Sequence, residues 1–490
     1  MVLTGGWVVL TLSGCSGPGP KPAPAKDMGG VAPADHWSAS NSSGEVANGW
    51  VADFRDPKLV LLVLEALQGN PDLQASSARL EQSIAIAKQA GAALYPTIGL
   101  NAGGTKTSYL EANPAKNKNQ IGTGSDYTQL GAGLTVSWEL DVWGKLSSAK
   151  QGAKLQAEAT ASDYAAARQS LAAQVSKSWF LVQEAKMQKD LADEFVKNYA
   201  ANLKIVQAQY NAGDVSRQDL DTSEADLANS QQSAQAAETA LNTSIRSLEV
   251  LLGRYPGAEI QATDMGTVPP PIPAGLPSQI LERRPDVVAA ERQVASAFQY
   301  SKSASAARLP QIDLTGGINT MNNSFAALVN PASAATNFGL NLFQPLFDAG
   351  LLQSQFEQAK GVQKEAVANY KSTAFNAFKE VEVALDNDIS LARQEDSLAR
   401  AAKGYEGARK IAEIRYKEGE IDLTSLLFVQ RQELQAKAAL INAHGSRLTN
   451  RVDLHLALGG NFEEGTIDLI PAPMADNDSN GQAGGATAKK

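Results

Sequence analysis

Alternating apolar and polar residues mark four segments of this chain as β-strands. Their apolar positions lie two residues apart, or four where a glycine intervenes between Leu314 and Ile318, as one apolar face of a strand requires. These positions are Ile98, Leu100 and Ala102; Leu130, Ala132, Leu134, Val136 and Trp138; Ile312, Leu314 and Ile318; and Phe338, Leu340 and Leu342. Strands of about 9–11 residues with this period suit a tilted crossing of a membrane, although a half-buried antiparallel sheet alternates in the same way.

A very long helix is predicted after the second strand of each pair. No proline lies within residues 115–255 or 346–470. The composition favours helices over about 144–210 and 350–416, each of which reaches about 100 Å at a rise of 1.5 Å per residue. Such helices need partner helices along their whole length, because globular helices average only about 11–12 residues.

A second helix with a seven-residue repeat follows each long helix. The repeat positions are Leu220, Leu227, Ala234, Leu241 and Leu248 in one helix, and Leu427, Leu434, Ile441, Leu448 and His455 in the other. A spacing of seven held over four steps indicates a left-handed coiled-coil seam.

The two halves of the chain repeat one pattern, which indicates an internal duplication. Each half reads as a helix of about 22 residues, two strands and two long helices. Three pairs of segments carry the similarity: NPDLQASSARL (70–80) and RPDVVAAERQV (284–294), ALYPTIGLNAGG (93–104) and ARLPQIDLTGGI (307–318), and QYNAGDVS (209–216) and RYKEGEID (415–422).

Composition and charge argue against a nucleic-acid-binding protein and against membrane-spanning helices. Among 490 residues, 43 Lys and Arg face 52 Asp and Glu, for a net charge of −9, which argues against nucleic-acid binding as the main function. No apolar run of about 18 residues occurs, so no segment is expected to cross a bilayer as a helix. A membrane-spanning part would therefore consist of β-strands.

Four strands are too few to close a membrane barrel within one chain. An open sheet in lipid leaves unpaired N–H and C=O groups at both edges, and small membrane barrels need about eight strands or more. Several copies are therefore expected to share one barrel. The long helices would continue below it as an α-helical barrel, so that strand and helix form two levels of one tube.

The single cysteine lies in a motif typical of bacterial lipoproteins. Cys15 ends the sequence Leu-Ser-Gly-Cys after a short apolar stretch, which predicts a signal peptide over residues 1–14 and acylation of Cys15. Ser16 at the next position favours release to the outer membrane. The following Pro-, Gly-, Ala- and Ser-rich residues are expected to form an extended tether.

These features together resemble the outer membrane factors of tripartite efflux pumps, in the TolC superfamily and its NodT-type lipoprotein branch. The resemblance rests on WELDVWGK (138–145), LERRPDVVAAERQV (281–294) and QPLFDAGLL (344–352), together with the paired glycine turns and the lipoprotein motif. It implies an α+β membrane protein. Three chains would form a 12-stranded β-barrel, with four strands per chain, continued by a 12-helix α-barrel.

The implied domain organisation follows the duplication. The expected parts are a signal peptide (1–14), a lipidated N-terminus and tether (15–55), a first repeat (56–255), a Pro-rich equatorial connector (256–284), a second repeat (285–460), and a C-terminal equatorial segment with a disordered tail (461–490).

The resemblance implies a passive export duct of an RND-type (resistance-nodulation-division) efflux pump, for drugs or other small molecules. The chain would be a lipid-anchored protein of the Gram-negative outer membrane that extends into the periplasm. Implied partners are two further copies, a periplasmic membrane-fusion adaptor, an inner-membrane RND transporter and outer membrane lipid. Two alternatives are an exit duct for type I protein secretion and a soluble coiled-coil scaffold.

The turns between the paired long helices are the candidate periplasmic gate and adaptor-docking sites. After Tyr210 and Tyr416, Gly213 and Gly419 permit the positive φ that a helix end requires. In the family, an aspartate six residues after the first-turn glycine and a tyrosine three residues before the second-turn glycine tie the helices together at the closed end. Asp219 and Tyr416 match them. Asp219 also has a simpler interpretation, since an acidic residue favours a helix start.

The second turn departs from the pattern of the family. Well-known members carry aspartates six and nine residues after the glycine, where this chain has Ser425 and Phe428. The closed end is therefore expected to be more apolar, and Asp422, one helical turn away, is a second candidate for an acidic group there.

No catalytic, metal or cofactor site is predicted. The chain shows no phosphate-binding loop or nucleophile elbow. His444 and His455 share a helix face, but no third ligand is near them in the sequence. Arg283 and Arg284, just before Pro285, are expected to pack the junction of the repeats. The protein is therefore not expected to be an enzyme.

Overall fold

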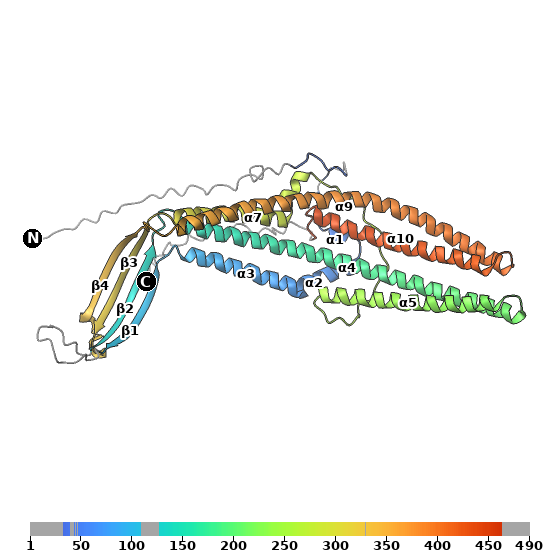
Figure 1. Ribbon diagram of the computed structural model, residues 1–490, viewed down its shortest axis with the longest axis horizontal. Helices are drawn as coiled ribbons and strands as arrows, with labels where there is room; N and C mark the ends of the chain where they lie inside the picture. Colours follow the sequence, from blue (N-terminus) through green and yellow to red (C-terminus); the bar gives the residue numbers. More distant parts are fainter. Residues whose placement is uncertain are drawn as a thin grey trace, which may run out of the picture.

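The chain forms an elongated body with a sheet at one end and two helical turns at the other (Figure 1). The computed structural model describes residues 33–39, 44, 46, 48–108, 127–328 and 330–462. Cys15, the expected signal peptide and the expected C-terminal tail lie outside the described residues.

The predicted strands are confirmed, and they form one antiparallel sheet in the order β1-β2-β3-β4. The strands are β1 (Thr97–Thr107), β2 (Tyr127–Glu139), β3 (Gln311–Asn322) and β4 (Ala334–Phe343). A short helix, α8 (Phe325–Leu328), and a 3₁₀ turn, η3 (Pro331–Ser333), connect β3 to β4.

The register gathers the apolar side chains on one face of the sheet. Leu100 lies opposite Leu134, and Leu134 lies opposite Ile318. On the outer strands this face is open to solvent, since Leu100 and Phe338 are each 79% exposed. The other face carries mainly glycine and polar residues. Within the described part of the chain, the outer edges of β1 and β4 pair with no further strand.

The long helices lie within two residues of their predicted bounds. They are α4 (Lys145–Ala212) and α9 (Leu351–Lys417), followed by α5 (Arg217–Leu251) and α10 (Leu423–Ala457). The four form a layer in the order α5-α4-α10-α9. Every helix in the described part of the chain is too short or too polar to cross a membrane.

Two helices of 22 residues run beside the sheet-proximal halves of the long ones, as the duplication predicts. These are α3 (Pro71–Ala92), which packs on α4, and α7 (Pro285–Ala306), which packs on α4 and α9. All ten positions of the predicted seven-residue repeat are buried or half-buried, as a packed helical seam requires.

Aspartate caps shape the short connections from β2 to α4 and from β4 to α9. The two carboxylate oxygens of Asp141 accept hydrogen bonds from the backbone N–H groups of Leu146 and Ser147, each at 2.8 Å. Gly144 adopts φ +74° just before α4. Before α9, Asp348 accepts hydrogen bonds from the N–H groups of Gly350 at 2.9 Å and Leu352 at 3.0 Å, and Gly350 adopts φ +85°. The cap satisfies amides that the first helical turn leaves unpaired, so the chain turns from strand to helix within the short connections 140–144 and 344–350.

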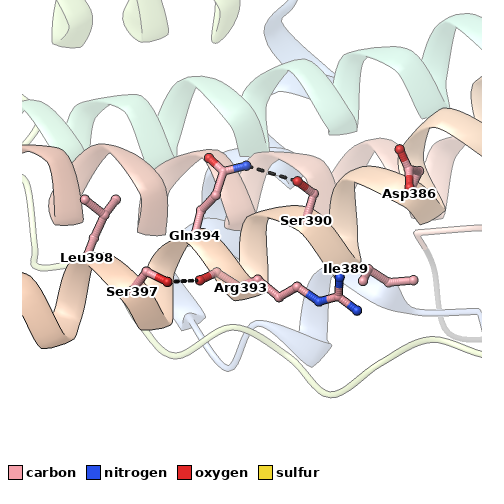
Figure 2. Close-up of a pocket in the computed structure, with 7 residues that line it drawn as sticks. All are labelled: Asp386, Ile389, Ser390, Arg393, Gln394, Ser397 and Leu398. Carbon is pink, nitrogen blue, oxygen red and sulfur yellow. Dashed lines mark hydrogen bonds between the residues drawn. The ribbon is translucent and has the colours of Figure 1, made fainter.

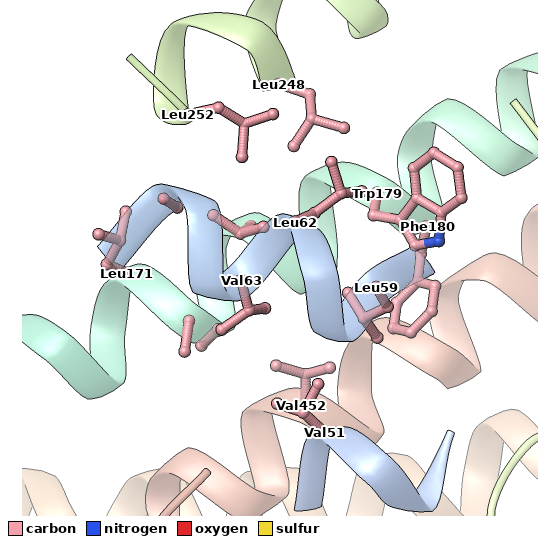
Figure 3. Close-up of a cluster of buried hydrophobic side chains, with 14 of the residues drawn as sticks. Val51, Leu59, Leu62, Val63, Leu171, Trp179, Phe180, Leu248, Leu252 and Val452 are labelled. Carbon is pink, nitrogen blue, oxygen red and sulfur yellow. The ribbon is translucent and has the colours of Figure 1, made fainter. Parts of the chain in front are cut away.

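A compact apolar core surrounds the middle of the long helices. It is built on α1 (Trp50–Asp53) and α2 (Pro57–Gly69). Figure 3 shows Leu59, Leu62 and Val63 of α2 among side chains of α4, α5 and α10. Asp56 caps α2, and its Oδ2 also accepts hydrogen bonds from Trp179 Nε1 at 2.7 Å and Gln183 Nε2 at 3.2 Å. The same carboxylate therefore starts one helix and attaches it to another.

Arg283 and Arg284 pack against other segments at the junction of the two repeats, as predicted. A 3₁₀ turn, η2 (Pro277–Gln279), and α6 (Ile280–Arg283) lead into α7. The buried Arg284 pairs with Asp286 at 2.7 Å and with Glu380 of α9 at 2.8 Å, and it donates a hydrogen bond to the carbonyl of Ala457 in α10. Arg283 donates to the Val46 carbonyl.

His455 is buried in the same region as α1. Its ring stacks on Trp50 with centroids 5.5 Å apart and an interplanar angle of 19°. Burial, together with the positive charge of Arg451 one turn earlier, lowers its pKa to about 3. The imidazole therefore stays neutral in the folded protein at pH values where the unfolded chain takes up a proton.

Acidification should therefore destabilise the fold through His455. Between about pH 6.5 and 3, this residue should lower the free energy of unfolding by about 1.4 kcal/mol per pH unit. His455→Phe keeps an aromatic ring at this position but removes the titratable group. The thermal unfolding midpoint of this variant, measured by circular dichroism in detergent, should therefore fall less between pH 6.5 and 4.5 than that of the wild type. His36→Phe, at an exposed position, should keep the wild-type slope. Equal slopes in all three proteins would refute this role.

Candidate functional site

The two turns between paired long helices lie together at the end of the molecule farthest from the sheet (Figure 1). The α4–α5 turn contains Gly213 and the α9–α10 turn contains Gly419. Both glycines adopt left-handed φ, +85° and +74°. The structure therefore brings together, at one end, the residues that the sequence predicted as a gate.

The first turn is closed by hydrogen bonds on both sides. The N–H of Gly213 donates to the Tyr210 carbonyl at 3.0 Å, and the N–H of Asp214 donates to the Gln209 carbonyl at 2.9 Å, which ends α4 in a Schellman-type motif. Ser216 and Asp219 then form a capping box at the start of α5. The Ser216 Oγ accepts from the Asp219 N–H at 3.2 Å, and Asp219 Oδ2 accepts from the Ser216 N–H at 3.0 Å.

The second turn uses the same two residue types in exchanged positions. Asp422 occupies the cap position of α10 and accepts a hydrogen bond from the Ser425 N–H at 2.8 Å. Hydrogen bonds from the Ser425 side chain and backbone lower the pKa of Asp422. Ser216 and Asp219 of the first turn thus correspond to Asp422 and Ser425 of the second. Asp422 is occupied as a helix cap, and Ser425 is its partner.

Tyr416 joins the two helical pairs just above the turns. The residue is only 6% exposed, and its hydroxyl donates to Gln209 Oε1 of α4 at 2.9 Å. Burial, and secondly the negative charge of Asp219, raises the pKa of Tyr416. The hydroxyl therefore stays protonated near the Asp219 carboxylate, and it connects α9 to α4 rather than bonding to Asp219.

Tyr210 is half-buried against the apolar cluster between the helical pairs, whereas Phe428 lies at the surface. The guanidinium of Arg217 lies 6.0 Å from the centre of the Tyr210 ring and pairs with Asp221 at 2.8 Å. Phe428 is 54% exposed, whereas its neighbours Leu426 and Leu427 are buried in the apolar cluster between the helical pairs. The phenylalanine therefore presents an apolar group to solvent close to the turn.

Sequence reasoning missed a buried ion cluster above the turns. The side chain of Glu433 is 0% exposed; it lies 2.6 Å from Arg409 Nε of α9 and 3.0 Å from Lys437 Nζ. Lys437 also pairs with Glu194 of α4 at 3.3 Å. The i,i+4 spacing of Glu433 and Lys437 was a weak sign of this cluster, but its burial depends on three helices that are distant in the sequence.

An open groove of about 590 Å³ runs along the outer side of α9. Figure 2 shows that its lining side chains, from Asp386 to Leu398, all belong to this one helix. Ser397 and Gln394 make hydrogen bonds only within α9. The groove therefore reflects the uncovered edge of the helical layer.

Comparison with known proteins agrees with this architecture. The family model described as "Outer membrane efflux protein" matches residues 62–254 and 276–460. The cation efflux system protein CusC of Escherichia coli K12 is 28% identical over 458 residues, covering 92% of this chain and 98% of its own. A crystal structure of CusC, whose published description refers to transmembrane channel formation, matches with a TM-score of 0.78 at 26% identity, covering 88% of this chain and 98% of the other.

Two further relatives have similar coverage. The probable outer membrane lipoprotein SilC of Salmonella typhimurium is 28% identical, covering 93% of this chain and 98% of its own. The pyoverdine export outer membrane protein OpmQ of Pseudomonas aeruginosa is 28% identical, covering 93% and 95%. Similarity therefore extends over both repeats and over nearly the whole length of each relative.

The glycines of the two turns should resist substitution for backbone reasons alone. A Cβ at Gly213 or Gly419 would meet no atom within 4 Å, but the left-handed φ costs an L-residue about 1–2 kcal/mol. Gly213→Ala and Gly419→Ala should therefore lower the thermal unfolding midpoint. Gly404→Ala, at an equally open position inside α9, should raise it, because alanine stabilises a helix by about 0.5–1 kcal/mol. A rise in all three variants would contradict the strained turns.

Proposed function

This chain belongs to the outer membrane efflux protein family, and we propose that three copies form the exit duct of a tripartite efflux pump. As a family member it is an outer membrane efflux protein, and its long helices extend into the periplasm. SilC is named as a lipoprotein, which supports acylation of Cys15 as the anchor of this chain.

The observation that carries the proposal is the sheet with one exposed apolar face and with two outer edges that pair with no further strand among the described residues. In lipid, each free edge would leave backbone groups without hydrogen bonds, at a cost of several kcal/mol per group. Three copies, with β4 of one chain beside β1 of the next, remove every edge and make a barrel of twelve strands. The apolar face then points to acyl chains, and the face rich in glycine, asparagine and threonine lines the lumen.

The helical layer extends this arrangement below the membrane. Three layers of four long helices make a tunnel of twelve, continuous with the barrel because β2 leads into α4 and β4 leads into α9 through short connections. The turns at Gly213 and Gly419 close its far end. We assign to them the periplasmic gate and the docking of a membrane-fusion adaptor, which connects the duct to an inner-membrane transporter of the RND class.

The duct performs no chemistry in this proposal, and the transporter supplies the energy. The relatives are named for different cargo, cations for CusC and pyoverdine for OpmQ. The same channel architecture therefore accompanies export of different solutes. Small molecules are the proposed cargo of this chain. At its tip, the exposed Phe428 and the capping role of Asp422 favour a closure that is less acidic than one formed by rings of free carboxylates.

Cross-linking between strand edges tests the shared barrel. Asn101→Cys on β1 and Asn337→Cys on β4 project from the same face of the sheet. Detergent-extracted protein treated with a flexible bis-maleimide should give dimers and trimers on a denaturing gel, and native mass spectrometry should report three chains. Ser137→Cys with Thr315→Cys, which face each other on β2 and β3, should link only within a chain. A monomeric mass, or a working control without any ladder, would refute the proposal.

Single-channel conductance tests the role of the first turn. Asp219→Ala should raise the conductance in planar bilayers, because it removes both its half of the capping box and the negative charge beside Tyr416; the lost cap alone is worth about 1 kcal/mol. Ser216→Ala removes the other half of the box but keeps the carboxylate, so it should raise conductance less. An equal rise in both variants would assign Asp219 to capping alone, and no change would remove it from the gate.

A further inference from the structure

We propose that His444 is a pH-sensitive latch, which fastens a connecting strap to the helical layer when the imidazole is protonated and releases the strap when the imidazole is neutral. The strap is residues 261–268 of the connector between the two repeats, and it has no regular secondary structure. It lies on the outer side of α4 and α10, against the apolar core at the middle of the long helices. The inference concerns a single chain and does not depend on the proposed trimer.

The two halves of the strap are held by different helices. The first half is attached to α4, where Asp264 pairs with Lys186 at 2.7 Å. The second half reaches α10, where the carbonyl of Gly266 lies 2.8 Å from Nε2 of His444. Within the described part of the chain, this is the one hydrogen bond that joins the strap to α10. The attachment of the second half therefore depends on the state of one imidazole.

The ring of His444 lies between two hydrogen-bond acceptors. Its Nδ1 is 2.6 Å from Oε1 of Glu395 in α9, and its Nε2 faces the Gly266 carbonyl. Burial raises the pKa of Glu395, but hydrogen bonds from His444 and from Arg447 together outweigh burial and lower this pKa. The ionised carboxylate and the backbone carbonyl have no proton to donate. Both hydrogen bonds therefore form only when the imidazole carries two protons.

Loss of one proton leaves the ring with a single N–H group for two acceptors. A hydrogen bond to an ionised carboxylate is about twice as strong as one between neutral groups, so the remaining proton stays on Nδ1 and points to Glu395. Nε2 then presents a lone pair to the Gly266 carbonyl, and the two groups repel each other. Arg447 donates to Oε2 of Glu395 at 2.7 Å in either state. Deprotonation therefore frees the strap while α9 and α10 stay joined.

The other charged groups around His444 are paired with one another. Asp396 of α9 lines the same cavity and lies 3.3 Å from Arg400. On the side of α4, Lys186 and Asp264 form their own pair. The two acceptors in contact with the ring therefore decide which of its hydrogen bonds form.

Release of the strap changes the outer surface of the helical layer. The strap covers part of a cavity of about 510 Å³, which is lined by side chains of α4, α9 and α10 and by Met265 of the strap itself. Met265 and Val268 also pack on the apolar core that contains Trp179. When the second half of the strap leaves α10, the cavity opens further and apolar side chains become accessible on the part of the protein that extends into the periplasm.

Nuclear magnetic resonance of methionine methyl groups tests the latch. Met187 and Met265 both line the cavity, and the chain has only six methionines. In detergent-extracted protein with ¹³C-labelled methionine methyl groups, the Met265 signal, assigned with Met265→Leu, should change between pH 5 and pH 8, the range in which histidine changes charge. The ratio of fastened to released strap should change at least about tenfold, as expected for one hydrogen bond to a charged group. The signal of Met321, on strand β3, should stay constant.

Two substitutions should fix the latch in opposite states. The amide nitrogen of a glutamine reaches the position of Nε2, so His444→Gln should keep the bond to Gly266 and give the pH 5 signal of Met265 at both pH values. The amide of an asparagine reaches only the position of Nδ1, so His444→Asn should give the signal of the released strap at both. His36→Gln, at an exposed position, should titrate like the wild type. The remaining histidine, His455, stays neutral over this range because its pKa is about 3.

Three results would overturn the latch. These are a wild-type Met265 signal that is the same at pH 5 and pH 8, a pH-dependent change that persists in both His444 variants, and identical Met265 signals in the glutamine and asparagine variants. None of these results would affect the shared barrel, which is tested separately by the native mass and by the cross-links between strand edges.

Discussion

The structure depends on one constraint, the pairing of backbone groups at the edges of a four-stranded sheet. Within the described chain β1 and β4 each have one neighbour, and the apolar face of the sheet is uncovered. Water would hydrogen-bond the backbone groups at the edges but would leave the apolar face exposed to solvent. Lipid would cover the apolar face but would leave the backbone groups at the edges without hydrogen bonds. The proposed ring of three chains is the arrangement in which both requirements are met.

The helical part repeats this logic at a larger scale. Helices of 68 and 67 residues gain little from intrinsic propensity and depend on lateral packing. Inside the chain, α2 and the core around Trp179 provide that packing at mid-height, and the Glu433 cluster and Tyr416 provide it near the turns. In the proposed trimer, the outer faces of α5 and α9 are available for contact with a neighbouring chain, and so are the edges of the sheet above them.

The turns show how duplicated units reach the same geometry with different residues. A left-handed glycine ends the first helix in both copies, and a serine–aspartate pair begins the second helix. Because the serine and aspartate exchange places, comparison by position suggested a missing carboxylate at Ser425. The structure accounts for that serine as half of a cap. The exposed Phe428 still distinguishes the second turn as apolar.

By itself the sequence determined the elements and their order, because hydrophobic period, proline-free length and glycine position act locally. The strands, the long helices within two residues and the positive φ at Gly213 and Gly419 all follow from such local rules. Only the tertiary structure decided the register that gathers the apolar face, the burial of His455 against Trp50, the ion cluster around Glu433 and the hydrogen bond from Tyr416 to Gln209. These depend on which distant segments meet and on how deeply each side chain is removed from water, and neither can be read from the spacing of residues along one chain.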